Sequence, residues 1–215
     1  MSWILGILFV LIFLAMGLTH WMEQETALSE LRDHFDPSGF QPEEHQRVFE
    51  EGALYYITYG DTTKTPLLLI HGSPGDWTAW KELMIHPEIY INYFIIAIDR
   101  IPYHKTTIKG SYALAEQSDY LKSIVNQYCS PCVVAGHSYG GALALQLGAD
   151  YPNQVAAVLS IAGTEAAPYQ RPKWYNRILN TPLQYLIAPF FRASNNEMLR
   201  FSDDLYALEK LAERS

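Results

Sequence analysis

Short, mostly apolar runs recur along the middle of the chain. They occupy residues 66–70, 94–99, 132–135 and 155–162. Runs of this length and composition are typical of strands buried on both faces of a parallel sheet. Between the second and third runs, the apolar residues of 111–128 recur at helical spacing. Strands that alternate with helices predict an α/β fold in which a mostly parallel sheet is wound with helices.

The longest apolar run lies at the beginning of the chain. Residues 3–18 are sixteen uninterrupted apolar or glycine positions, and continuing through Met22 makes twenty. Twenty helical residues span about 30 Å, the thickness of a bilayer core. The pattern predicts a transmembrane anchor over residues 1–22. A cleaved signal peptide is the alternative because residues 15–17 form a small-x-small site, whereas a core helix is rarely apolar on all sides.

Charges after this segment predict its orientation. No Lys or Arg follows it before Arg32, whereas acids stand at Glu23, Glu25 and Glu30. Because positive charge is retained on the cytoplasmic side, the domain of a single-pass membrane protein is expected on the extracytoplasmic side. Residues 23–45 are polar and acidic, contain a Pro-Ser-Gly turn, and predict a linker.

Two further regions complete the predicted organisation. An α/β core is expected over residues 46–168, and it opens with a strand pair over 46–59 that turns at Glu51 and Gly52. Residues 169–215 are rich in aromatic side chains and predict a helical, lid-like segment. The 215-residue chain therefore has room for one core with appendages.

The charge composition of the chain argues against nucleic acid as a binding partner. The net charge is -8 and the isoelectric point is near 5.3. Nucleic-acid binding needs a basic face to neutralise phosphates, and the sequence contains no basic cluster of that kind. We therefore expect a small-molecule substrate, a membrane contact through the N-terminal helix, and no nucleic-acid partner.

A single cysteine pair, Cys129 and Cys132, has C-x-x-C spacing. Redox chemistry is the weakest interpretation, because the pair follows a predicted helix instead of opening one, where the helix dipole lowers the pKa of a thiol. A zinc site requires two further ligands, and the sequence has neither a second C-x-x-C nor an H-x-x-x-H. A local disulfide outside the cytoplasm and two buried thiols inside it are the remaining alternatives. We expect no metal and no cofactor.

Residues 136–141 (GHSYGG) follow the third apolar run directly. This G-x-S-x-G pattern is typical of a strained strand-to-helix turn, in which glycine at 136 and 140 avoids clashes. The turn would lift Ser138 above the sheet edge and point the N–H groups of the next helix at the place where negative charge develops. This geometry suits acyl transfer. A second glycine-rich loop, residues 71–75 (HGSPG), follows the first apolar run.

The order of these two loops and of the apolar run between them makes residues 47–162 resemble the α/β-hydrolase fold family. The resemblance implies a serine hydrolase in which Ser138 attacks an acyl carbonyl and the backbone N–H groups of Ser73 and Tyr139 form the oxyanion hole. Family members that open epoxides or remove halides use aspartate as nucleophile. Serine at position 138 therefore favours ester, thioester, amide or peracid chemistry on a small-molecule acyl substrate.

The resemblance also implies a histidine and an acid after the nucleophile, in the chain order Ser, Asp or Glu, His. Every histidine of this chain precedes Ser138, namely His20, His34, His45, His71, His86, His104 and His137. Among these, His104 is the better candidate for the base, whereas His71 is expected to brace its loop and His137 to point away from the serine. Glu165 is a candidate acid, with a solvated turn residue as its alternative.

Two interpretations follow from the absence of a histidine after Ser138. The first is a true hydrolase whose recorded sequence is C-terminally truncated inside or just after the lid-like segment. The second is a catalytically silent fragment or a binding module with the same half-sheet. The loop after residue 99 also departs from the family pattern, because Pro102 and His104 stand where glycines are usual.

Overall fold

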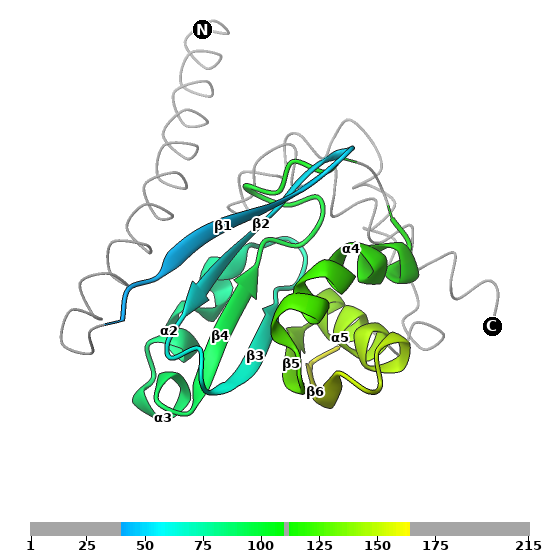
Figure 1. Ribbon diagram of the computed structural model, residues 1–215. Helices are drawn as coiled ribbons and strands as arrows, with labels where there is room; N and C mark the ends of the chain where they lie inside the picture. The colour runs from blue at the N-terminus through cyan, green and yellow to red at the C-terminus, as the bar shows by residue number, and fades with distance from the viewer. Residues whose placement is uncertain (1–39, 110–111, 164–215) are drawn as a thin grey trace, which may run out of the picture.

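The computed structural model describes residues 40–109 and 112–163 of the chain (Figure 1). The expected membrane anchor over 1–22, most of the expected linker over 23–45 and the lid-like segment over 169–215 lie outside the described residues. In the part of the chain that the structure describes, no helix combines the length and the apolar character needed to span a bilayer.

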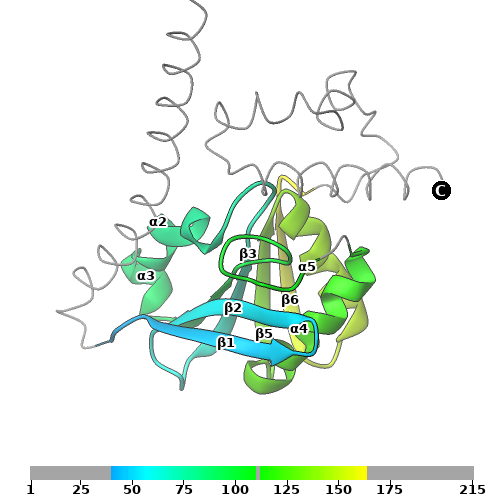
Figure 2. The ribbon, with the colours of Figure 1, turned by 90° about the horizontal axis from the view of Figure 1, so that it is seen from above.

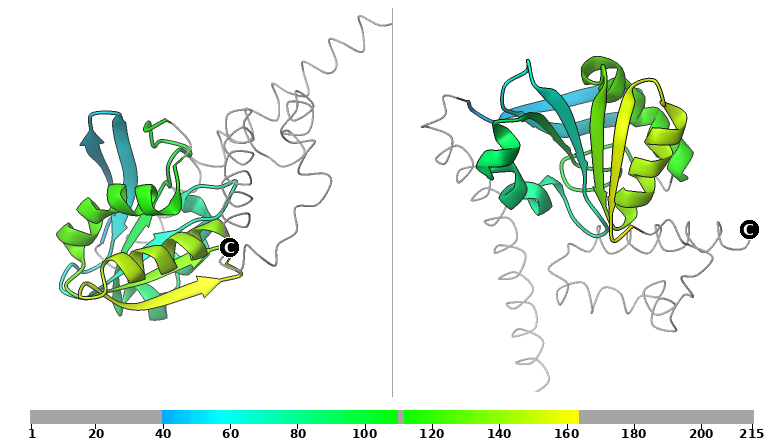
Figure 3. Two further views of the ribbon diagram at one scale, coloured as in Figure 1. Left: turned by 90° about the vertical axis from the view of Figure 1, so that its right-hand side faces the viewer. Right: turned by 90° about the horizontal axis from the view of Figure 1, so that it is seen from below.

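The described residues contain one sheet of six strands in the order β1-β2-β4-β3-β5-β6. β1 pairs antiparallel with β2 and β2 antiparallel with β4, whereas β4, β3, β5 and β6 are parallel. Figure 3 shows β1 in blue and β6 in yellow at opposite margins of the sheet. The strands are β1 Glu43–Phe49, β2 Gly52–Tyr59, β3 Thr65–Ile70, β4 Tyr93–Ile98, β5 Cys132–His137 and β6 Val155–Ile161. The mostly parallel α/β fold and the opening strand pair are therefore confirmed.

Helices cover both faces of this sheet (Figure 2). α4 (Leu114–Tyr128) and α5 (Tyr139–Asp150) pack on one face. The short helices η2 (Trp77–Trp80), α2 (Lys81–Met84) and α3 (Pro87–Tyr90) pack on the other. Both faces of β3, β4 and β5 are thus removed from water. β6, the last strand in the order, keeps Leu159 and Ile161 exposed, so the expectation that the run at 155–162 is buried on both faces is wrong.

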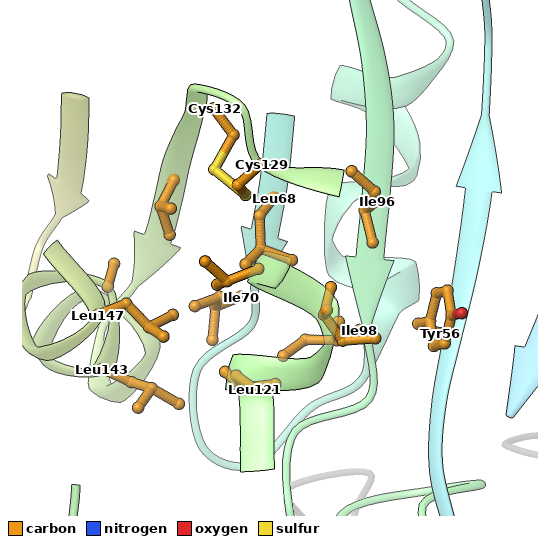
Figure 4. Packing of buried hydrophobic residues seen from close by; sticks show 14 of the residues in the cluster. Tyr56, Leu68, Ile70, Ile96, Ile98, Leu121, Cys129, Cys132, Leu143 and Leu147 are labelled. Atoms are coloured by element: carbon orange, nitrogen blue, oxygen red, sulfur yellow. A yellow bond between two sulfur atoms is a disulfide. The ribbon is translucent and has the colours of Figure 1, made fainter. Parts of the chain in front are cut away.

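This two-sided burial explains why the strands are continuous apolar runs. Successive side chains of a strand point to opposite faces. Leu68 and Ile70 of β3 pack on the α4 and α5 side, whereas Leu67 and Leu69 pack on the η2 side. Figure 4 shows the first of these cores, with Leu121 of α4 and the side chains of α5 against Leu68 and Ile70. β2, β3, β4 and β5 therefore each supply apolar residues to two cores at once, whereas β6 contributes only to the first.

Cys129 and Cys132 form a disulfide within the first core (Figure 4). Cys129 caps the C-terminal end of α4, and Cys132 opens β5. Both side chains are buried. Among the alternatives that the C-x-x-C spacing leaves open, the structure therefore selects the local disulfide.

β3 is the point at which the chain changes direction across the sheet. From β3 the chain passes to β4 on one side, and from β4 it crosses back through α4 to β5 on the other side. The connection after β3 runs over the η2 face, and α5 runs from the end of β5 over the opposite face. The connection after β3 and the turn after β5 therefore diverge to opposite faces of the sheet at the carboxyl ends of these two strands. Open α/β sheets bind ligands at such a switch point.

Candidate active site

Ser138 lies alone between β5, which ends at His137, and α5, which begins at Tyr139. Its backbone has φ 53° and ψ -120°, a conformation that costs a residue with a side chain about 1–3 kcal/mol. The amide of Ser138 donates to the carbonyl oxygen of Ile161 at 2.9 Å, and the carbonyl of Ser138 accepts from the amide of Gly141 at 2.9 Å. Bonds to β6 and within α5 therefore hold this half-buried serine in a strained turn.

Two glycines permit the turn because backbone atoms crowd their α-carbons. A β-carbon on Gly136 would lie 2.0 Å from the carbonyl oxygen of Gly140. A β-carbon on Gly140 would lie 2.2 Å from the carbonyl oxygen of Ile70, at the end of β3. Neither position admits a side chain without a shift of the backbone. The glycines of the motif therefore allow α5 to begin directly against β3.

The loop after β3 packs against this turn. Gly72 lies against Ser138 and His137. Ser73, the next residue, is half-buried, and its hydroxyl accepts a hydrogen bond from Nη2 of Arg100. The structure therefore brings the two glycine-rich loops, with Ser73 on one and Ser138 and Tyr139 on the other, to one edge of the sheet.

His71 at the end of β3 is fully buried, and both of its ring nitrogens are engaged. Nε2 accepts the backbone N–H of Arg100 at 2.9 Å, which leaves the proton on Nδ1, 2.7 Å from the carbonyl oxygen of Gly72. Burial, reinforced by the charge of Arg100, lowers the pKa of His71 to about 3. The neutral imidazole therefore braces the loop against the end of β4, as the sequence indicates.

His104 occupies the loop after β4 with a backbone φ of 47°, a left-handed conformation that glycine favours. Its Nδ1 is 2.7 Å from Oδ2 of Asp99, and its ring stands edge-on to Tyr55 of β2, with the centroids 6.5 Å apart. Burial opposes protonation of His104, but the hydrogen bond and the charge of Asp99 outweigh it and raise the pKa of the imidazole.

The position of His104 makes it a poor candidate for the general base. β2 and β5 are separated in the sheet by β4 and β3, so a ring that contacts Tyr55 lies toward the side of the sheet away from Ser138. The contacts of His104 hold the loop after β4 instead. His137 has an exposed side chain at the end of β5, and Glu165, the candidate acid, lies outside the described residues.

Two buried carboxylates fix the start of η2 beside the site. Oδ1 of Asp99 accepts the amide of Trp77 at 2.9 Å, and Oδ1 of Asp76 accepts the amide of Thr78 at 2.8 Å. Burial raises the pKa of Asp99. Burial also opposes ionisation of Asp76, but hydrogen bonds from Thr78 and nearby imidazoles outweigh it and lower the pKa of that carboxyl. Both carboxylates therefore position the chain after the HGSPG loop.

Arg100 is the residue of this region that the sequence analysis did not select. It is only 1% exposed, and its guanidinium carbon lies 4.2 Å from the centroid of the Tyr139 ring. The charged pair Asp99-Arg100 at the end of an apolar strand is the signal that identifies it, because an arginine so placed is rarely buried unless its side chain is bonded there. Residues 40–109 and 112–163 contain no group of three or more His, Cys, Asp or Glu side chains suited to a metal ion.

The sequence of the chain matches a known family over most of its length. Residues 67–214 match the profile of the Alpha/beta hydrolase family. Epoxide hydrolase 4 of Homo sapiens is 26% identical over 154 residues, which cover 67% of this chain and 40% of that protein. The lipase LipV of Mycobacterium tuberculosis is 33% identical over 108 residues, which cover 49% of this chain and 40% of that protein. The chain spans about a quarter to two fifths of the curated relatives it matches.

The fold is also shared with solved structures. The crystal structure of naproxen esterase from Bacillus subtilis superposes with a TM-score of 0.58 at 15% sequence identity, covering 89% of this chain and 68% of that chain. At this identity the likeness concerns the fold alone.

Proposed function

The chain belongs to the alpha/beta hydrolase family, and we propose that it is a serine hydrolase that cleaves ester, thioester or amide bonds of a small-molecule acyl substrate. Ser138 is the proposed nucleophile, and the backbone N–H groups of Ser73 and Tyr139 are the proposed oxyanion donors. The strained turn carries this proposal: a φ of 53° holds Ser138 at the switch point, directly before the 12-residue helix α5.

The chemistry follows from the groups that this edge of the sheet offers. Attack by Oγ of Ser138 on an acyl carbon converts the carbonyl oxygen into an oxyanion. The N-terminal end of α5 carries the positive end of the helix dipole, which favours negative charge beside it. Backbone donors held in place need no rearrangement as charge develops, and each can lower the barrier by about 3 kcal/mol.

Removal of the proton from Ser138 requires a general base. His71 does not fit this role, because its two nitrogens are committed to Arg100 and Gly72. His104 is committed to Asp99 through Nδ1 and contacts β2. The proposal therefore assigns the nucleophile and the oxyanion donors to this chain. The proton of Ser138 passes to a base other than these two histidines and then to the alcohol, thiol or amine that leaves.

The names of similar proteins point to two chemistries. LipV is named as a lipase and the Bacillus subtilis protein as an esterase, whereas the human relative is named as an epoxide hydrolase. The resemblance described for the sequence implies aspartate as nucleophile in epoxide-opening members, and serine stands at position 138 here. The residue type at the turn therefore supports acyl hydrolysis over epoxide opening.

A fluorophosphonate probe, which phosphonylates an activated serine hydroxyl, tests the proposal on the full chain. Wild type is expected to gain one adduct in its intact mass, and Ser138→Ala none. Ser123→Ala is the matched control, because Ser123 is a serine of α4 whose hydroxyl donates to the carbonyl of Tyr120, and it is expected to label like wild type. An unlabelled wild type rejects the proposal and favours a catalytically silent binding module. Labelling that survives Ser138→Ala rejects the assigned nucleophile.

Hydrolysis of a p-nitrophenyl ester and of styrene oxide separates the two chemistries. The proposal expects turnover of the ester that is lost in Ser138→Ala, and no turnover of the epoxide. Turnover of the epoxide that requires Ser138 would contradict the proposed substrate class.

We also propose that the apolar N-terminal residues anchor the chain in a membrane, in a single pass with the hydrolase domain on the extracytoplasmic side. The support is the sequence alone, namely twenty residues without a charge from Trp3 to Met22. The protein is expected to stay in the membrane fraction after alkaline carbonate extraction. Release into the supernatant would argue against the anchor.

A further inference from the structure

The buried side chain of Arg100 connects the two loops of the candidate site. We infer that Arg100 is the positioning residue of the oxyanion site, in which one guanidinium holds both residues whose backbone N–H groups are proposed to bind the oxyanion. The inference rests on the proposed function, because it adds a role to the same site.

Arg100 holds the loop after β3 at two points. Its side-chain Nη2 donates to the hydroxyl of Ser73. Its backbone N–H donates to Nε2 of His71 at 2.9 Å, and Nδ1 of that imidazole donates to the carbonyl of Gly72 at 2.7 Å. The residues on both sides of Gly72 are therefore bonded to the same arginine.

Arg100 also holds the first residue of α5. The guanidinium carbon lies 4.2 Å from the centroid of the Tyr139 ring. Nη1 of Arg100 donates to Oε1 of Gln117 at 3.3 Å, and Nε2 of Gln117 donates to the hydroxyl of Tyr139 at 3.0 Å. Arg100 thus contacts the face of the Tyr139 ring directly and its hydroxyl through Gln117, and Tyr139 is only 3% exposed.

The planar shape of the guanidinium is essential to this arrangement. The ring of Tyr103 also lies close to it, with a centroid distance of 4.7 Å. A guanidinium can stack on aromatic rings while its N–H groups donate in the plane, whereas a lysine ammonium is a compact point charge without that geometry. This position therefore requires an arginine, and a positive charge alone does not replace it.

Positioning matters here because the two proposed donors belong to separate segments. Ser73 follows β3 and Tyr139 opens α5, yet both N–H groups must lie within about 3 Å of one oxygen. A misplacement of about 1 Å can cost about a hundredfold in rate. Arginine remains protonated at every ordinary pH, so this brace acts on the rate and not on its pH dependence.

The kinetic test compares Arg100→Met and Arg100→Lys with Lys105→Met in the full chain. Lys105 is a matched control, because its Nζ also lies over a tyrosine ring, 4.9 Å from the centroid of Tyr55, but on the β2 side. We expect kcat on a p-nitrophenyl ester to fall about a hundredfold in both Arg100 variants, with KM and the pH midpoint of kcat unchanged. Lys105→Met is expected to retain wild-type kcat, and Arg100→Lys with wild-type kcat would overturn the inference.

Amide hydrogen exchange tests whether Arg100 holds the two segments, and it does not depend on catalytic activity. Arg100→Met is expected to accelerate exchange in both segments, residues 71–75 and 138–141, by about tenfold or more, and Lys105→Met in neither. If wild type shows neither turnover nor labelling, the proposed function fails, and the exchange result still decides whether Arg100 holds the two segments. Unchanged exchange in Arg100→Met, or faster exchange in one segment only, overturns the inference.

A milder variant covers the case in which Arg100→Met does not fold. Gln117→Met leaves Arg100 in place and removes the link between Nη1 of Arg100 and the hydroxyl of Tyr139, together with the bond from Nε2 of Gln117 to the carbonyl of Tyr112. It is expected to lower kcat about tenfold and to accelerate exchange at 138–141 while leaving 71–75 protected, because the bond to Ser73 persists. Wild-type kcat together with wild-type exchange in this variant would contradict the brace.

Discussion

A β-carbon on Gly72 would lie 3.0 Å from the β-carbon of Ser138. It would also lie 3.1 Å from the carbonyl oxygen of His137, so the loop after β3 leaves no room for a methyl group beside the turn. We expect Gly72→Ala to displace Ser138 by a few tenths of an ångström. The rate of fluorophosphonate labelling should fall about tenfold or more, while urea unfolding shows a loss of only about 1–2 kcal/mol. A wild-type labelling rate in the folded variant would contradict the contact.

Gly136→Ala should lower the free energy of unfolding much more than Gly72→Ala does. Its β-carbon would meet the carbonyl oxygen of Gly140 at 2.0 Å, and backbone atoms on both sides cannot move independently. We expect a loss of about 3 kcal/mol or more in the free energy of unfolding, measured by urea denaturation.

Gly148→Ala in α5 is the control for Gly136→Ala. Its β-carbon would lie 2.7 Å from Cγ2 of Val158, a side-chain atom of the last strand and not a backbone atom of the turn, and alanine favours the helix. Its stability should stay within about 1 kcal/mol of wild type. Equal losses in Gly136→Ala and Gly148→Ala would show that the turn does not require its glycine.

Because the backbone of Ser138 is strained, glycine at this position should be more stable than alanine, the reverse of the usual order. At an ordinary position glycine is less stable than alanine by about 0.5–1 kcal/mol. At φ 53° and ψ -120°, glycine avoids the strain that both serine and alanine carry. We therefore expect Ser138→Gly to be more stable than Ser138→Ala by about 1 kcal/mol in urea unfolding. A less stable glycine variant would mean that the turn carries no such strain.

His71 predicts a loss of stability in acid. The unfolded chain takes up a proton with the ordinary histidine pKa of 6.5, whereas burial first, and then the charge of Arg100, lowers the folded pKa to about 3. Protonation therefore favours the unfolded state, and this contribution is fully present above pH 6.5 and is lost as pH falls toward 3. The slope from this one group is about 1.4 kcal/mol per pH unit.

His71→Gln tests that slope. Removing the titrating ring should flatten the decline of the unfolding free energy between pH 6.5 and 4. The variant should also lose about 1–3 kcal/mol at pH 7, because glutamine has no group at the position of Nδ1 and the carbonyl of Gly72 loses its donor. An unchanged slope would assign the acid sensitivity to other groups.

The disulfide between Cys129 and Cys132 is expected to contribute modestly. It closes a very short loop, so the chain-entropy contribution is only about 2 kcal/mol. The double variant Cys129→Ala, Cys132→Ala should lose about that amount in urea unfolding, and wild type should show no free thiol by thiol titration under denaturing conditions without reductant. Two titrating thiols would contradict the bond.

Local sequence predicts much of this fold because the signals are short-range. The apolar run at 66–70 anticipates β3, Thr65–Ile70, since a strand buried on both faces leaves no polar alternation. The glycines at 136 and 140 likewise anticipate the turn at Ser138, because they remove the side chains that the turn cannot hold. Helix α4 begins at Leu114, three residues after the start of the helical pattern at Ser111, since caps are set by local bonding that periodicity does not report.

The sequence by itself thus determined the strands, the helix α4 and the position of the strained serine, but not the short helices η2, α2 and α3. Backbone preference and apolar spacing act between near neighbours, and a four-residue helix is too short to show either. Only the tertiary structure decided that β3 lies between β4 and β5, that His104 turns toward Tyr55 of β2, and that Arg100 reaches both Ser73 and Tyr139. These relationships join segments that are distant along the chain. They depend on how crossover connections place whole strands, and no local pattern carries that information.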